Sequence, residues 1–158
     1  MKTYKLFRIR DGDLYPLYVE AGRKVRQGVW EEARAGRLTA DGKHVYGRTG
    51  LLSARPGWHS TEVPFTDWIG RKGADGRLYQ RRGTAWTECE VDGRQIIVTD
   101  RYGLRTVPDG WYYFRTNPKQ DRPWIISGRI KVIRILTHDE VAEICGEHGI
   151  RAQPMAED

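Results

Sequence analysis

Residues 55–64 hold the densest group of chemically active side chains in this 158-residue chain. They place a titratable imidazole, His59, beside two hydroxyls, Ser60 and Thr61, close to a Pro-Gly pair at residues 56–57. An imidazole with an ordinary pKa of about 6.5 can donate a hydrogen bond to a ribose or a phosphate, and the hydroxyls can brace a ligand or a neighbouring strand. A plain turn, in which Trp58 fills the core and the hydroxyls satisfy local groups, explains the same residues. The sequence leaves both interpretations open.

A second group of candidate site residues lies in residues 84–91, whose sequence pattern predicts a strand. Trp86, Glu88 and Glu90 fall on one face of it, because successive side chains point to opposite faces. Alternate residues are about 6.5–7 Å apart, so one carboxylate can act as an acid and the other as a base if that face lines a cleft. An ordinary strand with both carboxylates in solvent and Cys89 inside is the simpler interpretation, and the pattern favours it.

The charge balance bears on the class of partner. Lysine and arginine number 27 against 21 aspartates and glutamates, a formal charge of +6, and 20 of the 27 are arginines. Guanidinium groups bind phosphate through two hydrogen bonds and stack on bases, so this composition suits a nucleotide or a nucleic acid. A genome rich in G and C gives the same excess of arginine whatever the protein does. The basic residues form short clusters, which argues against one disordered arm that binds nucleic acid.

Composition also excludes several classes of protein. The chain has 39% hydrophobic residues and 17 aromatic ones, counted as 6 Trp, 8 Tyr and 3 Phe, so it should fold. Its two cysteines lie far apart and lack metal-ligand spacing, so we expect buried thiols, no disulfide framework and no metal. No apolar run reaches the ~20 residues that span a bilayer, and the first residues lack the apolar core of a secretory signal. We therefore expect a soluble, cytoplasmic protein with no membrane partner.

Turn residues predict a fold rich in hairpins. The Asp-Gly pair tolerates the positive φ angles of tight turns, and it occurs at residues 11–12, 41–42, 75–76, 92–93 and 109–110. We therefore expect one α+β domain over residues 1–150, mainly antiparallel β hairpins with a C-terminal helix packed on the sheet. A frayed tail should follow over residues 151–158.

Two hairpins and one long strand are predicted individually. Residues 4–10 pair with 14–19, and residues 84–91 pair with 94–99, because these segments carry β-branched and aromatic side chains around Asp-Gly turns. Residues 124–136 form the last strand, which a Ser-Gly pair breaks near its middle. The second half of that strand is apolar on both faces, which predicts a position inside the sheet.

Two helices are predicted. Thr137 and Glu140 have the spacing of a capping box, in which each side chain accepts a backbone N–H at the start of a helix. Apolar residues then recur at helical spacing until Gly149, so this helix should pack one face on the sheet. A second, short helix is predicted over residues 29–36.

Six segments in order carry a likeness to a known family. They are Lys5-Leu6-Phe7-Arg8, Leu14-Tyr15-Pro16-Leu17-Tyr18-Val19, Gly28-Val29-Trp30, Arg55-Pro56-Gly57-Trp58-His59, Trp86 with Glu88, and Trp124-Ile125-Ile126 through Ile144-Cys145. Together they resemble a domain of unknown function found in phages and mobile elements of gut and soil bacteria. The resemblance covers nearly the whole chain, and it implies a genomic context without a reaction.

A looser likeness rests on four short motifs. Arg8 lies in the first predicted strand, residues 58–61 read Trp-His-Ser-Thr, residues 66–69 read Thr-Asp-Trp-Ile, and residues 88–90 read Glu-Cys-Glu. In this order they resemble the arginine-serine-glutamate branch of the ADP-ribosyltransferase superfamily, whose small mixed β folds bind NAD between two sheets. The resemblance implies Arg8 on the pyrophosphate, Trp58 and His59 around the nicotinamide ribose, Ser60 and Thr61 bracing the site, and Glu88 or Glu90 as the catalytic carboxylate. It also implies a helix over residues 66–69.

The chain departs from that family at two positions. Glu62 stands where the family has its last serine, and residues 121–123, Asp-Arg-Pro, stand where strand order places the catalytic carboxylate. Without a carboxylate to polarise the breaking bond, the fold would bind NAD or another nucleotide and transfer poorly. We therefore expect an ADP-ribosyltransferase-like protein with an NAD or nucleotide site, either active or degenerate.

Two other classes of function stay open. Arginine clusters and exposed aromatic side chains suit a nucleic-acid-binding accessory protein. Exposed Trp and Arg residues are also anchors in protein interfaces, which suits an inhibitor that binds a host defence protein.

Overall fold

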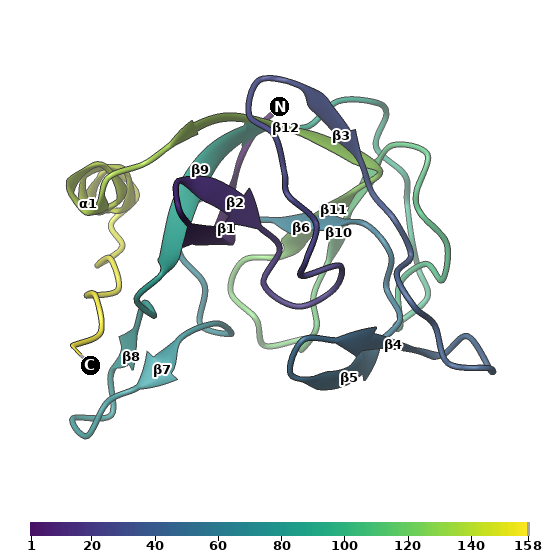
Figure 1. The fold of residues 1–158 in the computed structure, drawn as a ribbon, viewed down its shortest axis with the longest axis horizontal. Coiled ribbons are helices and arrows are strands. Elements are labelled where there is room, and N and C mark those ends of the chain that lie inside the picture. Colours follow the sequence, from purple (N-terminus) through teal and green to yellow (C-terminus); the bar gives the residue numbers. More distant parts are fainter. Residues whose placement is uncertain (158) are drawn as a thin grey trace.

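The computed structural model describes residues 1–157 and shows a single α+β domain built mostly from antiparallel strands, as the turn residues predict. Within these residues the chain has one helix, α1 (His138–Glu147). The strands are β1 (Lys2–Arg10), β2 (Asp13–Tyr15), β3 (Trp30–Glu32), β4 (His44–Gly47), β5 (Gly50–Ser53), β6 (Trp58–Ser60), β7 (Arg71–Lys72), β8 (Leu78–Tyr79), β9 (Thr84–Glu90), β10 (Trp111–Phe114), β11 (Trp124–Ser127) and β12 (Arg129–Ile135). Figure 1 shows α1 on one side of the strands, with the β4–β5 and β7–β8 hairpins projecting from the body.

Two antiparallel sheets form the body of the domain. The larger has five strands in the order β2-β1-β9-β12-β3, and the smaller has three in the order β10-β11-β6. The predicted N-terminal hairpin forms, because Ile9 pairs with Leu14 across the β1–β2 turn, but its second strand ends at Tyr15 and residues 16–19 form no strand. Strand β12 pairs with β9 on one side and β3 on the other, which confirms the interior position predicted from its two apolar faces.

The two sheets are joined at two places. Strand β1 meets the end of β6, where the backbone N–H groups of Tyr4 and Thr61 each donate to the other's carbonyl oxygen at 2.8 Å. The chain also passes from the smaller sheet to the larger at Ser127 and Gly128, where the predicted strand breaks. Glycine is needed there, because a Cβ on Gly128 would collide with the carbonyl oxygen of Pro108. Backbone hydrogen bonds and a continuous chain segment therefore connect the two sheets.

Apolar side chains fill three layers. The layer between the sheets includes Phe7 and Cys89 from the larger sheet and Trp58 from the smaller one. A second layer lies between the larger sheet and α1, where Trp86 packs with Val141. A third covers the opposite face of the smaller sheet. Because side chains alternate along β9, Trp86 faces the helix and Cys89 faces the smaller sheet.

Three predicted elements are wrong. Residues 29–36 contain strand β3, which pairs with β12 at the edge of the larger sheet, and form no helix. Residues 94–99 form no strand, although the Ile96 N–H donates to the Trp111 carbonyl oxygen at 2.7 Å. Residues 66–69 form a turn where the family likeness implies a helix. Short segments such as these cannot nucleate a helix alone, so pairing with distant backbone decides their structure.

The C-terminal residues differ from the frayed tail expected over residues 151–158. Met155 forms a parallel bridge with Gln80, just after β8. The buried Gln153 side chain donates to backbone carbonyl groups in the turn that follows β6. These contacts tie the chain end to the body of the domain, while Asp158 lies outside the described residues.

The helix begins where the capping box predicts. The Glu140 N–H donates to Thr137 Oγ1 at 3.1 Å, and the Thr137 N–H donates to the Glu140 carboxylate at 3.0 Å. Val141 and Cys145 are buried against the larger sheet, which confirms the predicted apolar stripe. Both cysteines are free and buried. Among the described residues, no helix combines the length and the apolar character that crossing a membrane requires.

Candidate functional site

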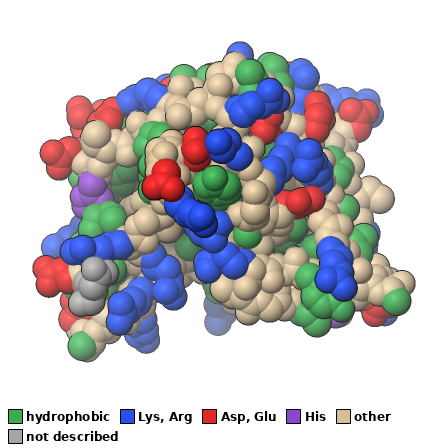
Figure 2. All heavy atoms as spheres, viewed as in Figure 1, with side chains coloured by type: hydrophobic (Ala, Val, Ile, Leu, Met, Phe, Trp, Pro, Cys, Tyr) green, Lys and Arg blue, Asp and Glu red, His purple; other side chains and the backbone are tan. Residues whose placement is uncertain are grey.

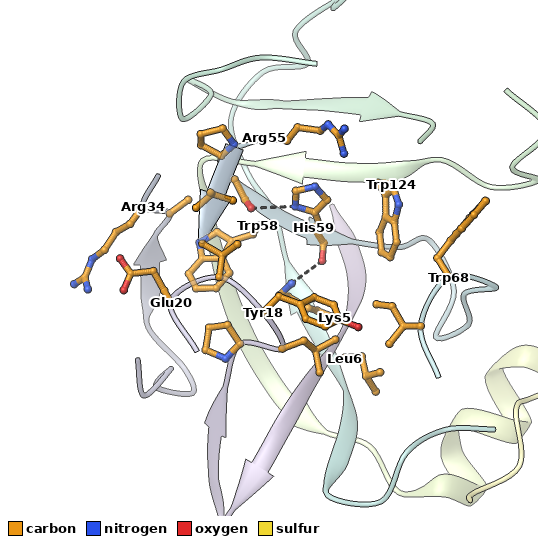
Figure 3. A pocket seen from close by; sticks show the side chains of 18 of the residues that line it. Lys5, Leu6, Tyr18, Glu20, Arg34, Arg55, Trp58, His59, Trp68 and Trp124 are labelled. Atoms are coloured by element: carbon orange, nitrogen blue, oxygen red, sulfur yellow. Dashed lines mark hydrogen bonds between the residues drawn. The ribbon is translucent and has the colours of Figure 1, made fainter. Parts of the chain in front are cut away.

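A cavity of about 290 Å³ opens between β1, β6 and the loop that follows β2. Figure 3 shows how side chains from these distant segments surround it. The charged and titratable side chains in its lining are Lys5, Glu20, Arg23, Arg34, Arg55 and His59. The aromatic side chains in its lining are Tyr4, Tyr18, Trp58, Trp68, Trp86 and Trp124. Four cations thus accompany one carboxylate within the described lining, so the cavity suits an anion that carries an aromatic ring.

Lys5 and His59 lie at the centre of this cavity. The Lys5 ammonium donates a hydrogen bond to the backbone carbonyl oxygen of His59 at 2.8 Å, marked by a dashed line in Figure 3. It also lies 5.5 Å from the ring centroid of Phe7 and 5.9 Å from that of Trp58. Burial lowers the pKa of Lys5 to about 8, while the Cys89 thiol acts in the opposite direction. Lys5 is therefore an amine held among aromatic rings, where its charged form is disfavoured.

The imidazole of His59 is neutral and offers an acceptor. Burial, reinforced by the positive charge of Lys5, lowers its pKa to about 3. Its Nδ1 lies 3.1 Å from the carbonyl oxygen of Gly57. A carbonyl oxygen only accepts, so Nδ1 carries the proton and Nε2 carries the lone pair. The sequence predicts that His59 donates to a ribose or a phosphate, whereas this arrangement suits it to accept from a ligand hydroxyl or N–H.

The Pro-Gly pair explains how this imidazole is positioned. Gly57 has a φ of 136°, a backbone conformation that side chains rarely adopt. A Cβ at this position would lie 2.5 Å from the Cγ2 atom of Ile126 on β11. The close approach of this backbone to β11 places the Gly57 carbonyl group beside the ring of His59.

Trp58 forms one wall of the cavity, and a hydrogen bond to β3 holds its indole ring in place. Its indole N–H donates to the backbone carbonyl oxygen of Glu31 at 2.9 Å. The Arg23 guanidinium lies 5.0 Å from the indole centroid and 3.7 Å from the Glu31 carboxylate. Glu31 is itself buried and also accepts from Arg26 at 2.9 Å. Strand β3 therefore positions both an aromatic wall and a guanidinium of the cavity.

The hydroxyls of Ser60 and Thr61 serve the fold. Both residues are buried. The Ser60 hydroxyl donates to the carbonyl oxygen of Ile125 at 3.4 Å, and the Thr61 hydroxyl lies 3.1 Å from that of Tyr4 and 2.6 Å from that of Val63. Neither is among the described residues that line the cavity. Both hydroxyls therefore satisfy backbone groups of the fold, which is the second of the two interpretations that the sequence left open for them.

Arg8 extends toward the loop after β2. Its guanidinium donates to the Ala21 carbonyl oxygen at 2.8 Å and lies 5.9 Å from the ring centroid of Tyr15. It is outside the described lining of the cavity. Arg8 and His59 therefore do not contribute to one binding surface in this structure.

Glu88 and Glu90 share a face of β9, which is the face toward α1. Glu88 lies 3.7 Å from the ammonium of Lys2 and 3.6 Å from the guanidinium of Arg134. Glu90 lies 3.5 Å from the N-terminal ammonium. Neither carboxylate belongs to the described lining of the cavity. Of the residues to which the sequence analysis gives a catalytic or binding role, Trp58 and His59 meet at the cavity, whereas Arg8, Ser60, Thr61, Glu88 and Glu90 lie outside its described lining.

Sequence reasoning missed Lys5 and Arg23 as site residues. A signal existed for Lys5, because it lies between Thr3 and Phe7 on the inward face of β1, where alternation predicts an apolar side chain. No comparable signal existed for Arg23, whose position depends on a tertiary contact with Glu31.

Figure 2 shows Lys and Arg side chains spread over one face of the molecule with Asp and Glu among them, so this face has no single basic stripe.

Across the described residues, no group of three or more His, Cys, Asp or Glu side chains is placed to hold a metal ion. Comparisons with protein-family models, with curated proteins and with solved structures found no significant match. The geometry of the cavity is therefore the basis for assigning a function.

Proposed function

We propose that this chain binds a nucleotide of the NAD or ADP-ribose type in the cavity beside His59. In this proposal the fold is ADP-ribosyltransferase-like and catalytically degenerate, and the protein comes from a phage or a mobile element. The observation that carries the proposal is the lining of the cavity, in which aromatic rings and four cations accompany one carboxylate. Small-molecule sites are mostly apolar pockets with a few placed polar groups, and this cavity has that composition.

The size of the cavity limits what it can hold. Its volume of about 290 Å³ is at the lower end of ligand pockets, which span roughly 300–1,000 Å³. It would hold one nucleoside half of a dinucleotide, while the other half would lie over the rim near Arg34. Arg23 is suited to the phosphate, because a guanidinium can donate to two oxygens at once.

The imidazole of His59 adds a preference for a sugar. Its Nε2 is an acceptor, and the hydrogen bond that the ring makes among the described residues is the one from Nδ1 to the Gly57 carbonyl oxygen. A ribose hydroxyl is a donor that can fill this position, whereas a phosphate oxygen has no proton to offer at neutral pH. The combination of aromatic walls, an acceptor and guanidinium groups thus matches the base, sugar and phosphate of a nucleotide.

Binding without transfer follows from the positions of the carboxylates. Transfer in the family that the chain resembles needs a carboxylate beside the nicotinamide ribose. Glu88 and Glu90 lie on the face of β9 toward α1, and Asp121 borders a separate surface depression with Tyr113 and Arg122. Glu20 is the one carboxylate in the described lining of the cavity, and Figure 3 shows it beside Arg34 and away from the His59 ring, where the proposal places the ribose. We therefore propose a binding protein.

Thermal unfolding in the presence of NAD, ADP-ribose and a short DNA duplex tests this proposal. A ligand at 100 times its dissociation constant stabilises a protein by about 2.7 kcal/mol, which raises the Tm of a chain of this size by roughly 5–10 °C. We expect that shift with NAD and with ADP-ribose. No shift with either nucleotide would overturn the proposal, and a shift with DNA alone would favour nucleic-acid binding instead.

A matched pair of arginine variants locates the binding. Arg34 and Arg37 are both exposed, but Arg34 lines the cavity, whereas Arg37 lies outside it, 4.8 Å from the ring centroid of Tyr46. We expect Arg34→Gln to weaken nucleotide binding about fivefold, equivalent to about 1 kcal/mol. Arg37→Gln should leave the affinity unchanged in the same titration, and equal losses in both variants would place the nucleotide elsewhere.

A further inference from the structure

Lys5 is the most unusual group in the cavity. Its ammonium donates to one backbone carbonyl group, that of His59, and lies over the rings of Phe7 and Trp58. Among the described ion pairs of the chain, none involves Lys5, although lysine is strongly hydrated and is rarely buried without a partner. Lys5 is nevertheless one of the described residues that line the cavity, so a ligand bound there would lie beside its side chain.

The amine of Lys5 is available in its neutral form. With a pKa of about 8, roughly one molecule in ten carries a neutral Lys5 at pH 7, against roughly one in a few thousand for an ordinary lysine. The titratable groups beside it are the Cys89 thiol on β9 and the His59 ring on β6. Burial raises the pKa of Cys89 to about 11, and His59 is neutral, so neither supplies a negative charge that would hold the ammonium form at pH 7. Neutral lysines in apolar pockets are nucleophiles toward carbonyl groups.

We propose that Lys5 is a nucleophilic amine that captures an aldehyde-bearing ligand in the cavity, namely the open-chain ribose end of an ADP-ribose-type nucleotide. The nucleotide part of this inference rests on the proposed function, whereas the amine chemistry rests on the surroundings of Lys5. The ligand class is thus a nucleotide with a free anomeric carbon.

The reaction needs no co-reactant. The lone pair of Lys5 Nζ attacks the aldehyde carbon, and a C–N bond forms while the carbonyl π bond opens to give a carbinolamine. The carbinolamine oxygen then leaves as water with the two hydrogens of the original amine, and a C=N bond remains. No oxidation or reduction occurs, and water reverses the reaction.

The surroundings of Lys5 suit this capture. Its hydrogen bond to the His59 carbonyl oxygen holds the amine in the cavity, beside the residue that carries the acceptor ring. A hydroxyl of the open ribose can donate to that ring, while phosphate oxygens accept from Arg23. The apolar rings of Phe7 and Trp58 exclude part of the water that would hydrolyse the imine.

Reductive trapping tests the inference directly. The full chain is incubated with ADP-ribose and sodium cyanoborohydride, which reduces an imine to a stable secondary amine, and the modified lysine is found by peptide mass spectrometry. We expect Lys5 to be modified at least tenfold more than any of the other six lysines. NAD is the matched probe, because its anomeric carbon is already bonded to nicotinamide and it should give no adduct.

Two variants provide the controls. Lys131 also lies over an indole ring, 5.4 Å from the centroid of Trp30, but it is outside the cavity. Lys131→Arg should therefore keep the adduct, and Lys5→Arg should lose it. If Lys5→Arg does not fold, the peptide map of the unaltered chain still decides the result.

The outcomes separate this inference from the proposed function. A Tm shift with both nucleotides but no reduced adduct at Lys5 would overturn the inference and leave nucleotide binding standing. Adducts spread evenly over the lysines would overturn it as well. If neither nucleotide shifts the Tm and no adduct forms at Lys5, both proposals fail. A selective adduct with ADP-ribose and none with NAD would support the capture of an aldehyde by Lys5.

Discussion

Lys5 donates its hydrogen bond to the backbone carbonyl oxygen of His59 and not to the imidazole, so one contact joins β1 to β6 and leaves Nε2 of the ring available. The same ammonium lies close enough to disfavour a second positive charge, and it is one of the causes of the low pKa of His59. At neutral pH this pair therefore presents the cavity with one donor and one acceptor.

The first prediction concerns stability in acid. In the unfolded chain His59 binds a proton near its ordinary pKa of about 6.5, whereas in the folded chain its pKa is about 3. The unfolded chain binds more protons between these values, so stability is complete above pH 6.5 and is lost as the pH falls toward 3. Between pH 6.5 and pH 4.5 the loss due to His59 should be about 2 kcal/mol.

Urea denaturation at both pH values measures this loss. His59→Gln should remove about 2 kcal/mol of the difference between the two pH values, because glutamine does not titrate. His44→Gln, at an exposed position outside the cavity, is the control and should keep the dependence of the unaltered chain. Parallel pH profiles for the unaltered chain and His59→Gln would contradict the prediction.

The second prediction concerns the buried carboxylate behind Trp58. Glu31→Gln keeps the shape of the side chain but deprives the Arg23 guanidinium, which is 11% exposed, of the carboxylate that lies 3.7 Å from it. We expect a loss of about 2 kcal/mol in the free energy of unfolding, because an unpaired buried charge is costly. The double variant with Arg23→Gln should lose less than the sum of the two single variants, by about 1 kcal/mol. Additive losses would show that the two groups do not interact.

The third prediction concerns the glycine of the Pro-Gly pair. Gly57→Ala introduces an unfavourable φ and a Cβ close to Ile126, so we expect a loss of about 2–4 kcal/mol. Gly76→Ala is the matched control, because Gly76 has a φ of 80° but nothing beyond its two chain neighbours lies within 4 Å of the place that its added methyl group would take. It should lose about 1 kcal/mol, from backbone strain alone. Equal losses would mean that contact with β11 does not hold the turn.

Local chemistry made part of the fold predictable. The capping box of Thr137 and Glu140 and the turn at Asp11 and Gly12 depend on neighbouring residues, and both occur as predicted. The short segment that forms β3 has no such local signal, because the partner that makes it a strand, β12, lies about a hundred residues later. The error there also concealed the role of Glu31.

The candidate site was predictable to a smaller extent for the same reason. Alternation correctly placed Glu88 and Glu90 on one face of β9, but nothing in the alternation says which face turns toward the helix. His59 stood out by its chemistry, whereas the protonation of its ring depends on Lys5, which lies 54 residues away in sequence. Residue type therefore identified one wall of the cavity, and tertiary pairing determined the charges around it.

The last prediction uses carboxylate variants to locate the bound nucleotide. For an anionic ligand, the negative charge of Glu20 in the cavity is repulsive, so Glu20→Gln should tighten binding of NAD about threefold to fivefold in a calorimetric titration, equivalent to about 1 kcal/mol. Glu88→Gln and Glu90→Gln should leave the affinity unchanged, because neither carboxylate belongs to the described lining of the cavity and both lie close to cationic groups outside it. Each should cost at most about 1 kcal/mol of stability through lost surface ion pairs. If Glu88→Gln or Glu90→Gln abolishes binding while Glu20→Gln has no effect, the nucleotide binds beside the carboxylates of β9 and not in the cavity.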